Sequence, residues 1–300
     1  MAGYRFSIAV LTKNRTNPAY VGARIGADRI AAAAGGEARH YVPSEPDDVA
    51  EQIALVGQAV RDGADAIVIA PAHPTALVPP LNEAYRAGLP IVTLVSRIDW
   101  HQAVCHVGSD DAALAAAITH HLCGHLGGVG RLAYIGGHPD SSTSHDRERG
   151  FRQALLDWPK IRCVAEAGGL YQREPARRAM AEIIAEGHAV DGVVAANDFM
   201  AAGVLDALDG ARQRLPVVGV NAVPEAVKAI RHGRLLASAA FDAMAMACIA
   251  TEAAIRALRG EAVPREIELP VEIVDATNAA RWDKPYEERD VPEWEDVAGM

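Results

Sequence analysis

Aromatic residues and long apolar runs are both scarce in this chain. Only 5% of its 300 residues are aromatic although 50% are hydrophobic, so the interior must be built mainly from Ala, Val, Leu and Ile. The longest apolar stretches, such as Ala64–Ala72 and Ala237–Phe241, fall far short of the roughly 20 residues that a bilayer-spanning helix requires. Small aliphatic interiors are typical of parallel sheets covered by helices. The composition therefore predicts a globular α/β chain without a membrane-spanning helix.

Cysteine and clustered positive charge are scarce as well. The four cysteines lie far apart and form no Cys-x-x-Cys pair, so neither a disulfide framework nor a zinc ribbon is indicated. The formal net charge is −10 and the basic residues are spread along the chain, so nucleic acid is not expected as a partner. The basic and apolar regions of a secretory signal are missing ahead of the first apolar run, Phe6–Leu11, which indicates a cytoplasmic chain or a processed one.

Catalytic and cofactor motifs are also missing. The run Gly124–Gly130 follows a helical pattern and precedes an apolar run, which reverses the order found in a dinucleotide-binding loop. The chain has no Gly-x-x-x-x-Gly-Lys phosphate loop and no Gly-x-Ser-x-Gly elbow. His121 and His125 have a spacing that can bind zinc, but no further ligands accompany them. We expect neither an enzyme, nor a metal site, nor a cofactor.

Apolar runs alternate with helical patterns along the whole chain. Expected strands are Phe6–Leu11, Ala38–Val42, Ala66–Ala70, Ile91–Leu94, Val104–Val107, Leu132–Ile135, Arg162–Glu166, Gly192–Ala195, Val217–Val220, Ala237–Ala240 and Val271–Val274. Expected helices include Asp47–Arg61, Asp111–Leu126, Arg147–Asp157, Pro175–Glu186, Phe199–Leu208 and Pro224–Arg231. Such βαβ alternation predicts parallel sheets with helices on both faces. So many strands suit two lobes, each with its own sheet, better than one sheet.

Two segments between expected elements bear on the function and on the boundary between the lobes. In Thr16–Tyr20, Asn17 and Pro18 form a strong helix start directly after the first expected strand. Ligands of α/β sheets bind at such carboxyl ends of strands. The segment Ser96–His106 has no helical pattern between two expected strands, which is what a crossover between lobes would look like. The first boundary is therefore expected near His106.

The ordered set of motifs resembles type I periplasmic sugar-binding proteins, the family of ribose-binding protein. The resemblance covers nearly the whole chain, from the first strand to about Val274. The segments that carry it are Ile8–Val10 through Asn17–Tyr20, Gly63–Ile67 through Pro71, Pro90–Leu94, Val107–Asp110, Arg147–Phe151 and Ala196–Asp198. An ordered set of this kind is more specific than any single motif.

This resemblance implies two Rossmann-like lobes with parallel sheets, joined by a three-strand hinge that closes on one small ligand. The N-terminal lobe would comprise residues 1–106 and 241–269, and the C-terminal lobe residues 107–240 and 270–300. The implied function is that of a periplasmic solute-binding protein, a monomer that captures a carbohydrate-like ligand in a cleft between the lobes. It would then deliver the ligand to the permease of an ABC importer.

The chemistry of sugars and the resemblance together suggest the contact residues. A sugar presents hydroxyl groups around its rim and C–H faces above and below, so it needs planar hydrogen-bonding groups and aromatic rings. By the resemblance, polar contact positions hold Asn17, Arg97, Arg149, Asn197 and Asn221, with Arg97 requiring a one-residue shift, and aromatic positions hold Tyr20 and Tyr171. Lys13 and Phe241 occupy further contact positions, and second-rank candidates are His73, Ser96, Trp100 and His138.

Several departures from the ribose pattern bear on the ligand. Val95-Ser96 stands where the family often has an acidic residue before the cleft arginine, and Asn221 where another carboxylate is common. Phe241 replaces an expected glutamine. Ribose itself is therefore not expected. Lys13, Arg97 and Arg149 together would favour a sugar acid, whereas a neutral sugar or polyol stays open because arginines contact neutral sugars in this family too.

Other interpretations remain open at this point. Asn17, Asp110 and Asn197 stand at helix starts, where they would cap free backbone N–H groups whatever the ligand. Trp100 could stack on a sugar or cover the hinge. The same two-lobe fold serves as the effector domain of lac-repressor-like regulators, which would need a helix-turn-helix ahead of the first strand. A sugar sensor for a membrane receptor would share every feature described.

Overall fold

The computed structural model describes residues 6–299, which form two compact units. Unit 1 runs to Ser109 and includes Ala243–Leu269 and the residues from Tyr286 onward. Unit 2 comprises Asp110–Asp242 and Pro270–Pro285. The chain therefore passes between the units at four points. The sequence-based division places the first crossing three residues earlier and the second two residues earlier. It also assigns the tail from Tyr286 to the C-terminal lobe, whereas the structure places it in unit 1.

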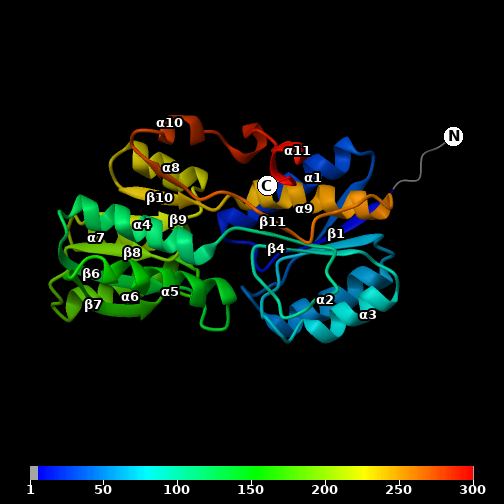
Figure 1. Ribbon diagram of the computed structural model, residues 1–300. Helices are drawn as coiled ribbons and strands as arrows, with labels where there is room; N and C mark the ends of the chain where they lie inside the picture. Colours follow the sequence, from blue (N-terminus) through cyan, green and yellow to red (C-terminus); the bar gives the residue numbers. More distant parts are fainter. Residues whose placement is uncertain (1–5, 300) are drawn as a thin grey trace. The chain divides into compact units, whose positions relative to one another are not determined.

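Unit 1 contains a six-stranded parallel sheet in the order β11-β5-β4-β3-β1-β2. Its strands are β1 (Ser7–Leu11), β2 (Glu37–Tyr41), β3 (Ala66–Ile69), β4 (Ile91–Leu94), β5 (Cys105–Gly108) and β11 (Glu266–Glu268). Helices α1 (Pro18–Ala33) and α9 (Ala243–Leu258) pack together on one face, and α2 (Val49–Arg61) and α3 (Val78–Arg86) cover the other (Figure 1). The tail adds a 3-10 turn, η1 (Tyr286–Glu288), and α11 (Trp294–Val297).

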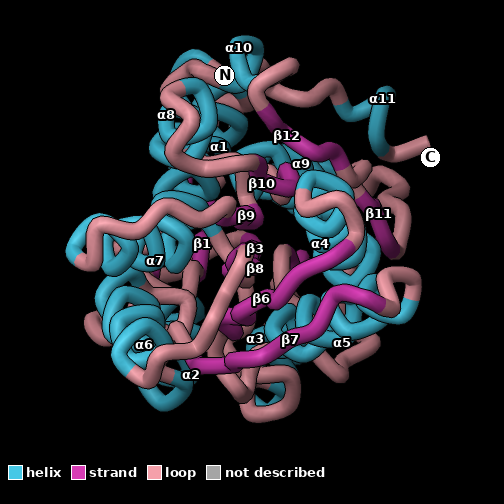
Figure 2. The backbone as a smooth tube through the Cα atoms, turned by 90° about the vertical axis from the view of Figure 1, so that its left-hand side faces the viewer, coloured by secondary structure: helices cyan, strands magenta, loops and turns pink. Residues whose placement is uncertain are grey.

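Unit 2 repeats this plan with the sheet order β12-β10-β9-β8-β6-β7. Its strands are β6 (Val129–Gly136), β7 (Lys160–Gly168), β8 (Gly192–Ala195), β9 (Val217–Val220), β10 (Ala237–Ala240) and β12 (Glu272–Asp275). Figure 2 shows α4 (Asp111–His125) and α5 (Ser142–Leu156) on one face, with α6 (Arg173–Ala185), α7 (Asp198–Gly210) and α8 (Pro224–Arg231) on the other. A short helix, α10 (Ala279–Trp282), contacts α8.

The strands form where short apolar runs can be buried on both faces. Every residue of β3, β4, β8 and β9 is buried, as the near-continuous Val and Ile runs of covered parallel sheets require. Four predicted strands, at 91–94, 192–195, 217–220 and 237–240, match the structure residue for residue. The predicted α/β fold with two sheets is confirmed.

Two strands at the sheet edges differ from the prediction. The sequence analysis missed β11, because Glu266-Ile267-Glu268 contains a single apolar residue. It pairs in parallel with β5 at one edge of the first sheet. The sequence analysis predicted parallel sheets, but in the second sheet β12 pairs antiparallel with β10.

None of the helices within residues 6–299 combines the length and the apolar character needed to cross a membrane. The expectations about a signal segment and a helix-turn-helix ahead of the first strand concern residues 1–5, which lie outside the described part of the chain.

Candidate functional site

The turn after β1 gathers buried polar side chains at the carboxyl edge of the unit 1 sheet. Asn17 is the N-cap of α1, and its Oδ1 accepts a hydrogen bond from the backbone N–H of Ala19 at 3.0 Å. Its own backbone N–H donates to Oδ1 of Asn14 at 2.9 Å. The predicted capping role is thus confirmed. Among residues 6–299, Nδ2 of Asn17 has no hydrogen-bond partner, so a donor remains for a ligand.

Lys13 and Tyr20 flank this cap and are also buried. Lys13 is the second residue after β1 and only 2% exposed, and its carbonyl accepts a hydrogen bond from the backbone N–H of Asp47. Asp47 adopts a positive φ of 61° and accepts a hydrogen bond from Nδ2 of Asn14 at 3.3 Å. The sequence analysis did not select either residue for the site, although Asn14 stands next to Lys13 and Asp47 is the first residue of an expected helix.

The turns after β3 and β4 complete the polar edge of unit 1. Buried Gln52 holds the first of these turns, because its amide donates to the carbonyl of Ala70 and accepts from the N–H of Ala72. After β4, Val95 has a φ of +66°, a strained conformation for a β-branched residue, and such strain clusters at functional sites. The hydroxyl of Ser96 is buried and has no hydrogen-bond partner among the described residues. An unpaired buried hydroxyl is costly, so Ser96 marks a place where a partner is expected.

His73 follows the β3 turn and has a structural role. Its Nδ1 accepts hydrogen bonds from the backbone N–H groups of Thr75 at 3.1 Å and Ala76 at 3.2 Å, which orders the loop leading to α3. His138 in unit 2 behaves similarly, since its Nδ1 accepts from the backbone N–H of Asp140 at 3.3 Å. Both second-rank residues are half-buried, and a ligand contact for them stays a prediction.

Arg147 is the buried cation at the carboxyl edge of unit 2. It lies on α5, is 4% exposed, and donates from Nε to Oδ1 of Asp111 at 2.6 Å. Its Nη1 donates to the carbonyl of Ala196, also at 2.6 Å. The guanidinium lies 4.9 Å from the ring centroid of Phe241 and 5.9 Å from that of Tyr171, within the range of cation–π attraction.

Arg149, which the resemblance selected, does not share this position. Its side chain is 64% exposed and pairs with Asp146 on the surface of α5. The signal that could have separated the two arginines is the helical period. Arg147 stands four residues before the buried Phe151, on the same helix face, whereas Arg149 stands two residues before it, on the opposite side.

The aromatic residues of unit 2 are fixed by close packing. Tyr171 is buried with a φ of 57°, and its hydroxyl forms a hydrogen bond with Oγ1 of Thr143 at 3.1 Å. Burial raises the pKa of Tyr171, so the phenol stays protonated. Gly137 leaves the space for this ring, because a Cβ there would lie 2.2 Å from a ring carbon of Tyr171.

Two asparagines follow β8 and β9 at the same edge. Asn197 is the N-cap of α7, where its Oδ1 accepts from the backbone N–H of Met200 at 2.8 Å, so its capping role is confirmed. Asp110 caps α4 in the same way, as predicted. Asn221 is buried, with a φ of 123°, and its side-chain amide has no hydrogen-bond partner within residues 6–299.

Asp198 fixes the loop that carries Asn221. Its two carboxylate oxygens accept hydrogen bonds from the hydroxyl of Ser238 at 2.7 Å and from the backbone N–H of Val223 at 3.0 Å. Burial is the largest influence on this group and raises the pKa of Asp198 from 3.8 to about 6. Asp198 therefore supports the site from behind, and its oxygens are already engaged.

Arg97 and Trp100 lie in a different part of unit 1 from the β1 turn. They line a cavity of about 330 Å³ beside β4 and β5, together with His106 and Arg265. Arg97 is 51% exposed and forms an ion pair with Glu266 of β11. The indole of Trp100 packs in the hydrophobic core and donates from Nε1 to Asn82 of α3 at 2.9 Å. The structure thus gives both residues structural partners away from the polar edge.

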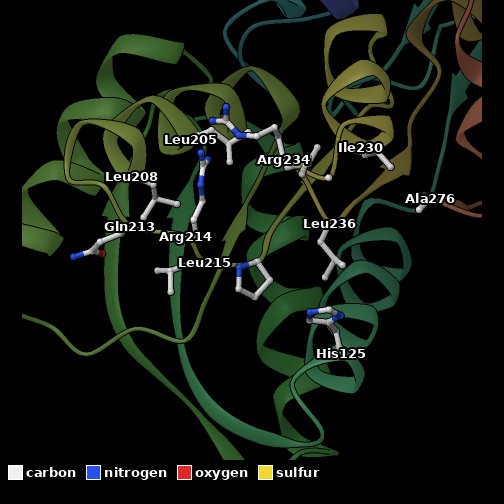
Figure 3. Close-up of a pocket in the computed structure, with 13 residues that line it drawn as sticks. His125, Leu205, Leu208, Gln213, Arg214, Leu215, Ile230, Arg234, Leu236 and Ala276 are labelled. Atoms are coloured by element: carbon white, nitrogen blue, oxygen red, sulfur yellow. The ribbon is translucent and has the colours of Figure 1, made fainter.

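A second cavity, of about 380 Å³, lies at the amino edge of the unit 2 sheet (Figure 3). Leu215 and Pro216 precede β9, Leu236 precedes β10, and His125 ends α4. Its two arginines are already paired, because Arg214 and Arg234 both donate to the carboxylate of Asp209. Ligands of α/β sheets bind at the opposite, carboxyl edge. We therefore assign the site to the carboxyl edges.

The histidines on α4 also have structural partners. Nδ1 of His120 accepts a hydrogen bond from Nε1 of Trp158 at 2.9 Å, and His121 lies 4.0 Å from Asp275. Over the described range of the chain, no group of three His, Cys, Asp or Glu side chains could hold a metal ion.

Comparison with known proteins places these features in a family context. The family model of the periplasmic binding protein domain matches residues 8–262. A D-ribose/D-allose-binding protein from Pseudomonas aeruginosa is 30% identical over 241 residues, which cover 76% of this chain and 75% of that protein. A xylitol-binding protein from Mycolicibacterium smegmatis is 29% identical over 192 residues, which cover 63% of this chain and 55% of the relative.

A solved structure supports the same relationship. An ABC transporter solute-binding protein from Mycobacterium smegmatis with bound glycerol has a TM-score of 0.86 and 29% sequence identity. The superposition covers 92% of this chain and 96% of that one.

Proposed function

This chain belongs to the periplasmic binding protein family of type I fold, and we propose that it captures a small sugar or polyol and delivers it to an ABC importer. The family was predicted from the sequence motifs and is confirmed by the match over residues 8–262. Delivery to an importer is supported by the glycerol-bound relative, which is described as an ABC transporter solute-binding protein.

One observation carries the proposal, namely the polar and aromatic cluster at the carboxyl edge of unit 2. There the buried guanidinium of Arg147 lies near the rings of Phe241 and Tyr171, and the amide of Asn221 has no partner among the described residues. Aromatic rings suit the C–H faces of a sugar, while amide and guanidinium groups suit its hydroxyls. Asn17 and Ser96 offer polar groups of the same kind at the carboxyl edge of unit 1.

The charges of the site favour a neutral ligand over a sugar acid. The case for an acid rested on Lys13, Arg97 and Arg149, but the structure pairs Arg97 with Glu266 and exposes Arg149. Arg147, which takes the place of Arg149 in this proposal, is already neutralised by Asp111. Only Lys13 remains of the three predicted cations, so a neutral polyol or sugar is the preferred ligand class.

Closure of the two units would follow from a higher affinity of the ligand for the closed arrangement than for the open one. A ligand that contacts polar groups of both units stabilises the closed arrangement only to the extent that it binds that arrangement more tightly. Selectivity would arise because each buried hydroxyl must find a partner, and a missing partner costs about 1–3 kcal/mol. This scheme is a binding cycle and includes no catalytic step.

The first test is calorimetric titration with xylitol, glycerol, D-ribose, D-allose and a sugar acid such as D-gluconate. We expect saturable binding of a polyol or neutral sugar, accompanied by a rise in melting temperature, because a ligand that binds only the native state stabilises it. Tight binding of the acid alone would reverse the preferred ligand class. No binding to any polyhydroxylated compound would contradict the proposed function.

A matched pair of variants tests the site. Asn221→Asp preserves the shape of the side chain and its tolerance of a positive φ but adds a negative charge and removes a donor. We expect it to change the affinity for the ligand at least tenfold and to abolish any binding of a sugar acid, with circular dichroism verifying that the variant is folded. Arg149→Ala is the control and should bind normally. Equal affinities for both variants would remove Asn221 from the site.

The cellular setting belongs to the same proposal. We propose that the protein works in the periplasm as a monomer and that an ABC permease recognises its ligand-bound form. The matched family and the relatives named above favour import over the regulatory alternative. A sensor that reports to a membrane receptor would bind the same ligands, and loss of ligand uptake after gene deletion would distinguish import from sensing.

A further inference from the structure

The C-terminal tail connects the two units at a point beyond the family's matched residues. The family model ends at residue 262, and the hinge predicted from the resemblance has three crossings. Here the chain crosses after Ser109, after Asp242 and after Leu269, and then a fourth time after Pro285. Residues 286–299, which we call the C-terminal latch, thus return to unit 1 after the chain has been part of unit 2.

The first half of the latch is docked on α1 and α9. Tyr286 is 7% exposed and clusters with Met244 and Cys248 of α9. Its ring lies against α1 so closely that a Cβ on Gly22 would be 2.6 Å from a ring carbon. Arg29 of α1 donates from Nη1 to the carbonyl of Arg289 at 2.7 Å and to that of Tyr286 at 3.4 Å.

The second half of the latch is held by Arg256 near the end of α9. The guanidinium lies 4.7 Å from the ring centroid of Trp294, a cation–π geometry, and 3.8 Å from the carboxylate of Glu295. Val297 of α11 is buried. The red segment of Figure 1 ends with α11 close to α1 and α9. Ring burial, hydrogen bonds from the Arg29 side chain to latch carbonyls, and charge contacts therefore hold both halves of the latch.

The chain is also anchored in unit 2 just before the latch begins. β12 pairs with all four residues of β10, and Asp283 forms an ion pair with Arg231 of α8. Only Lys284 and Pro285 separate Asp283 from Tyr286. Three residues of extended chain span about 10 Å at most, and proline reduces the freedom further. Two docked anchors are thus joined by a connection with almost no slack.

We propose that the C-terminal latch restricts how far the two units can separate and so limits the range of open conformations. This inference rests on the proposed function, because hinge closure on a ligand is the motion that it would restrain. Ligands act on such a protein by shifting its population between conformations. A latch that removes widely open states would leave fewer conformations to be lost when the units close on a ligand. Release of the latch would widen the distribution of distances between the units.

The test measures distances between the units in the protein without ligand. Nitroxide labels are placed on the exposed glutamines of α2 and α5 by Gln58→Cys and Gln153→Cys. Cys163, the one half-buried thiol, is replaced by serine, while the other three native cysteines are buried. Pulsed electron spin resonance then gives the distribution of label distances.

Three latch variants are compared with the parent protein. The first ends the chain at Pro285. The second, Gly22→Ala, places a methyl group against the Tyr286 ring and displaces it without disturbing the helical preference of α1. The third, Arg29→Met, removes the hydrogen bonds to the latch carbonyls. The matched control is Gly124→Ala in α4, where a Cβ meets no atom within 4 Å.

We expect broader distributions, shifted to longer distances, in all three latch variants and an unchanged distribution in the control. Hydrogen exchange of residues 286–297 should be slow in the parent protein and fast in Gly22→Ala. If the truncated chain does not fold, the two point variants carry the test. Unchanged distances in a folded variant whose latch exchanges rapidly would overturn the proposal. Because no ligand is present, failure of the ligand panel would contradict the proposed function and leave this result standing.

Discussion

The two units build the same kind of polar edge from different chemistry. In unit 1 the turns after β1 and β3 are held by neutral amides, those of Asn14, Asn17 and Gln52. In unit 2 the corresponding edge depends on two buried carboxylates, Asp111 with Arg147 and Asp198 with its two donors. A similar strand order in the two units thus does not dictate how the ligand edge is made rigid.

The difference predicts how each edge responds to change. A buried charge is tolerable only while its partners are present, because an unpaired ion in a low-dielectric interior is costly. An amide that loses one hydrogen bond loses much less. The edge of unit 2 should therefore be sensitive to charge deletion at Arg147 and to the titration of Asp198, whereas the turns of unit 1 that neutral amides hold should respond much less.

Deleting the buried cation should have the largest effect. Arg147→Ala removes the buried guanidinium that pairs with Asp111, and breaking one side of a buried pair costs about 3–5 kcal/mol of unfolding free energy. Urea denaturation followed by circular dichroism measures the loss. Arg149→Ala, on the exposed side of the same helix, should change stability by about 0.5 kcal/mol or less. Similar values for the two variants would show that burial does not distinguish these arginines.

The pH dependence of unit 2 should trace to Asp198. Burial raises its pKa from 3.8 to about 6, so between these values the native state binds more protons than the unfolded state. Its contribution to stability is therefore full below about pH 4 and is lost as pH rises through 6, by up to about 3 kcal/mol. Asp198→Asn cannot ionise and should lack this decline.

The measurement is the difference in unfolding free energy between the parent protein and Asp198→Asn at pH 4 and at pH 7. Exposed Asp140 provides the control as Asp140→Asn, which should track the parent protein at both values. If the difference in unfolding free energy between the parent protein and Asp198→Asn were the same at both pH values, Asp198 would not be the source of the pH dependence. The contrast in pH response between the two units would then disappear.

The smallest loss of stability is expected for the helix N-caps, a feature that both units share. Asn17→Ala and Asn197→Ala each remove an N-cap, which costs about 1 kcal/mol, whereas glycine at either position should cost only about a few tenths. Thermal unfolding of the four variants compares the caps directly. A much larger loss for Asn197→Ala would mean that the cap in unit 2 also supports its charged edge.

Much of the fold could be predicted because its signals are local. Runs such as 91–94 and 217–220 are almost entirely apolar and follow a proline, so the predicted strand bounds coincide with the observed ones. The caps Asn17 and Asn197 were predicted by their place before a helical pattern. By contrast, β11 forms because β5 offers an edge to pair with, and its own residues carry no strand signal.

The candidate site was predicted less well, for a physical reason. Arg147 and Arg149 are equal in chemistry, and only packing of α5 makes one of them buried. Arg97 stands directly after Ser96 in sequence, yet the loop turns its side chain toward Glu266 on another strand. A motif identifies the region of a site, while the direction of each side chain depends on the elements around it.

By itself the sequence determined the α/β class, the division into two units and the family, because periodicity and motif order are properties of neighbouring residues. Only the tertiary structure decided which arginine is buried and where the tail docks. Arg147 meets an aspartate 36 residues away, and Arg29 holds a carbonyl 260 residues away. Contacts between such distant residues form only after the chain has folded, so no local pattern records them.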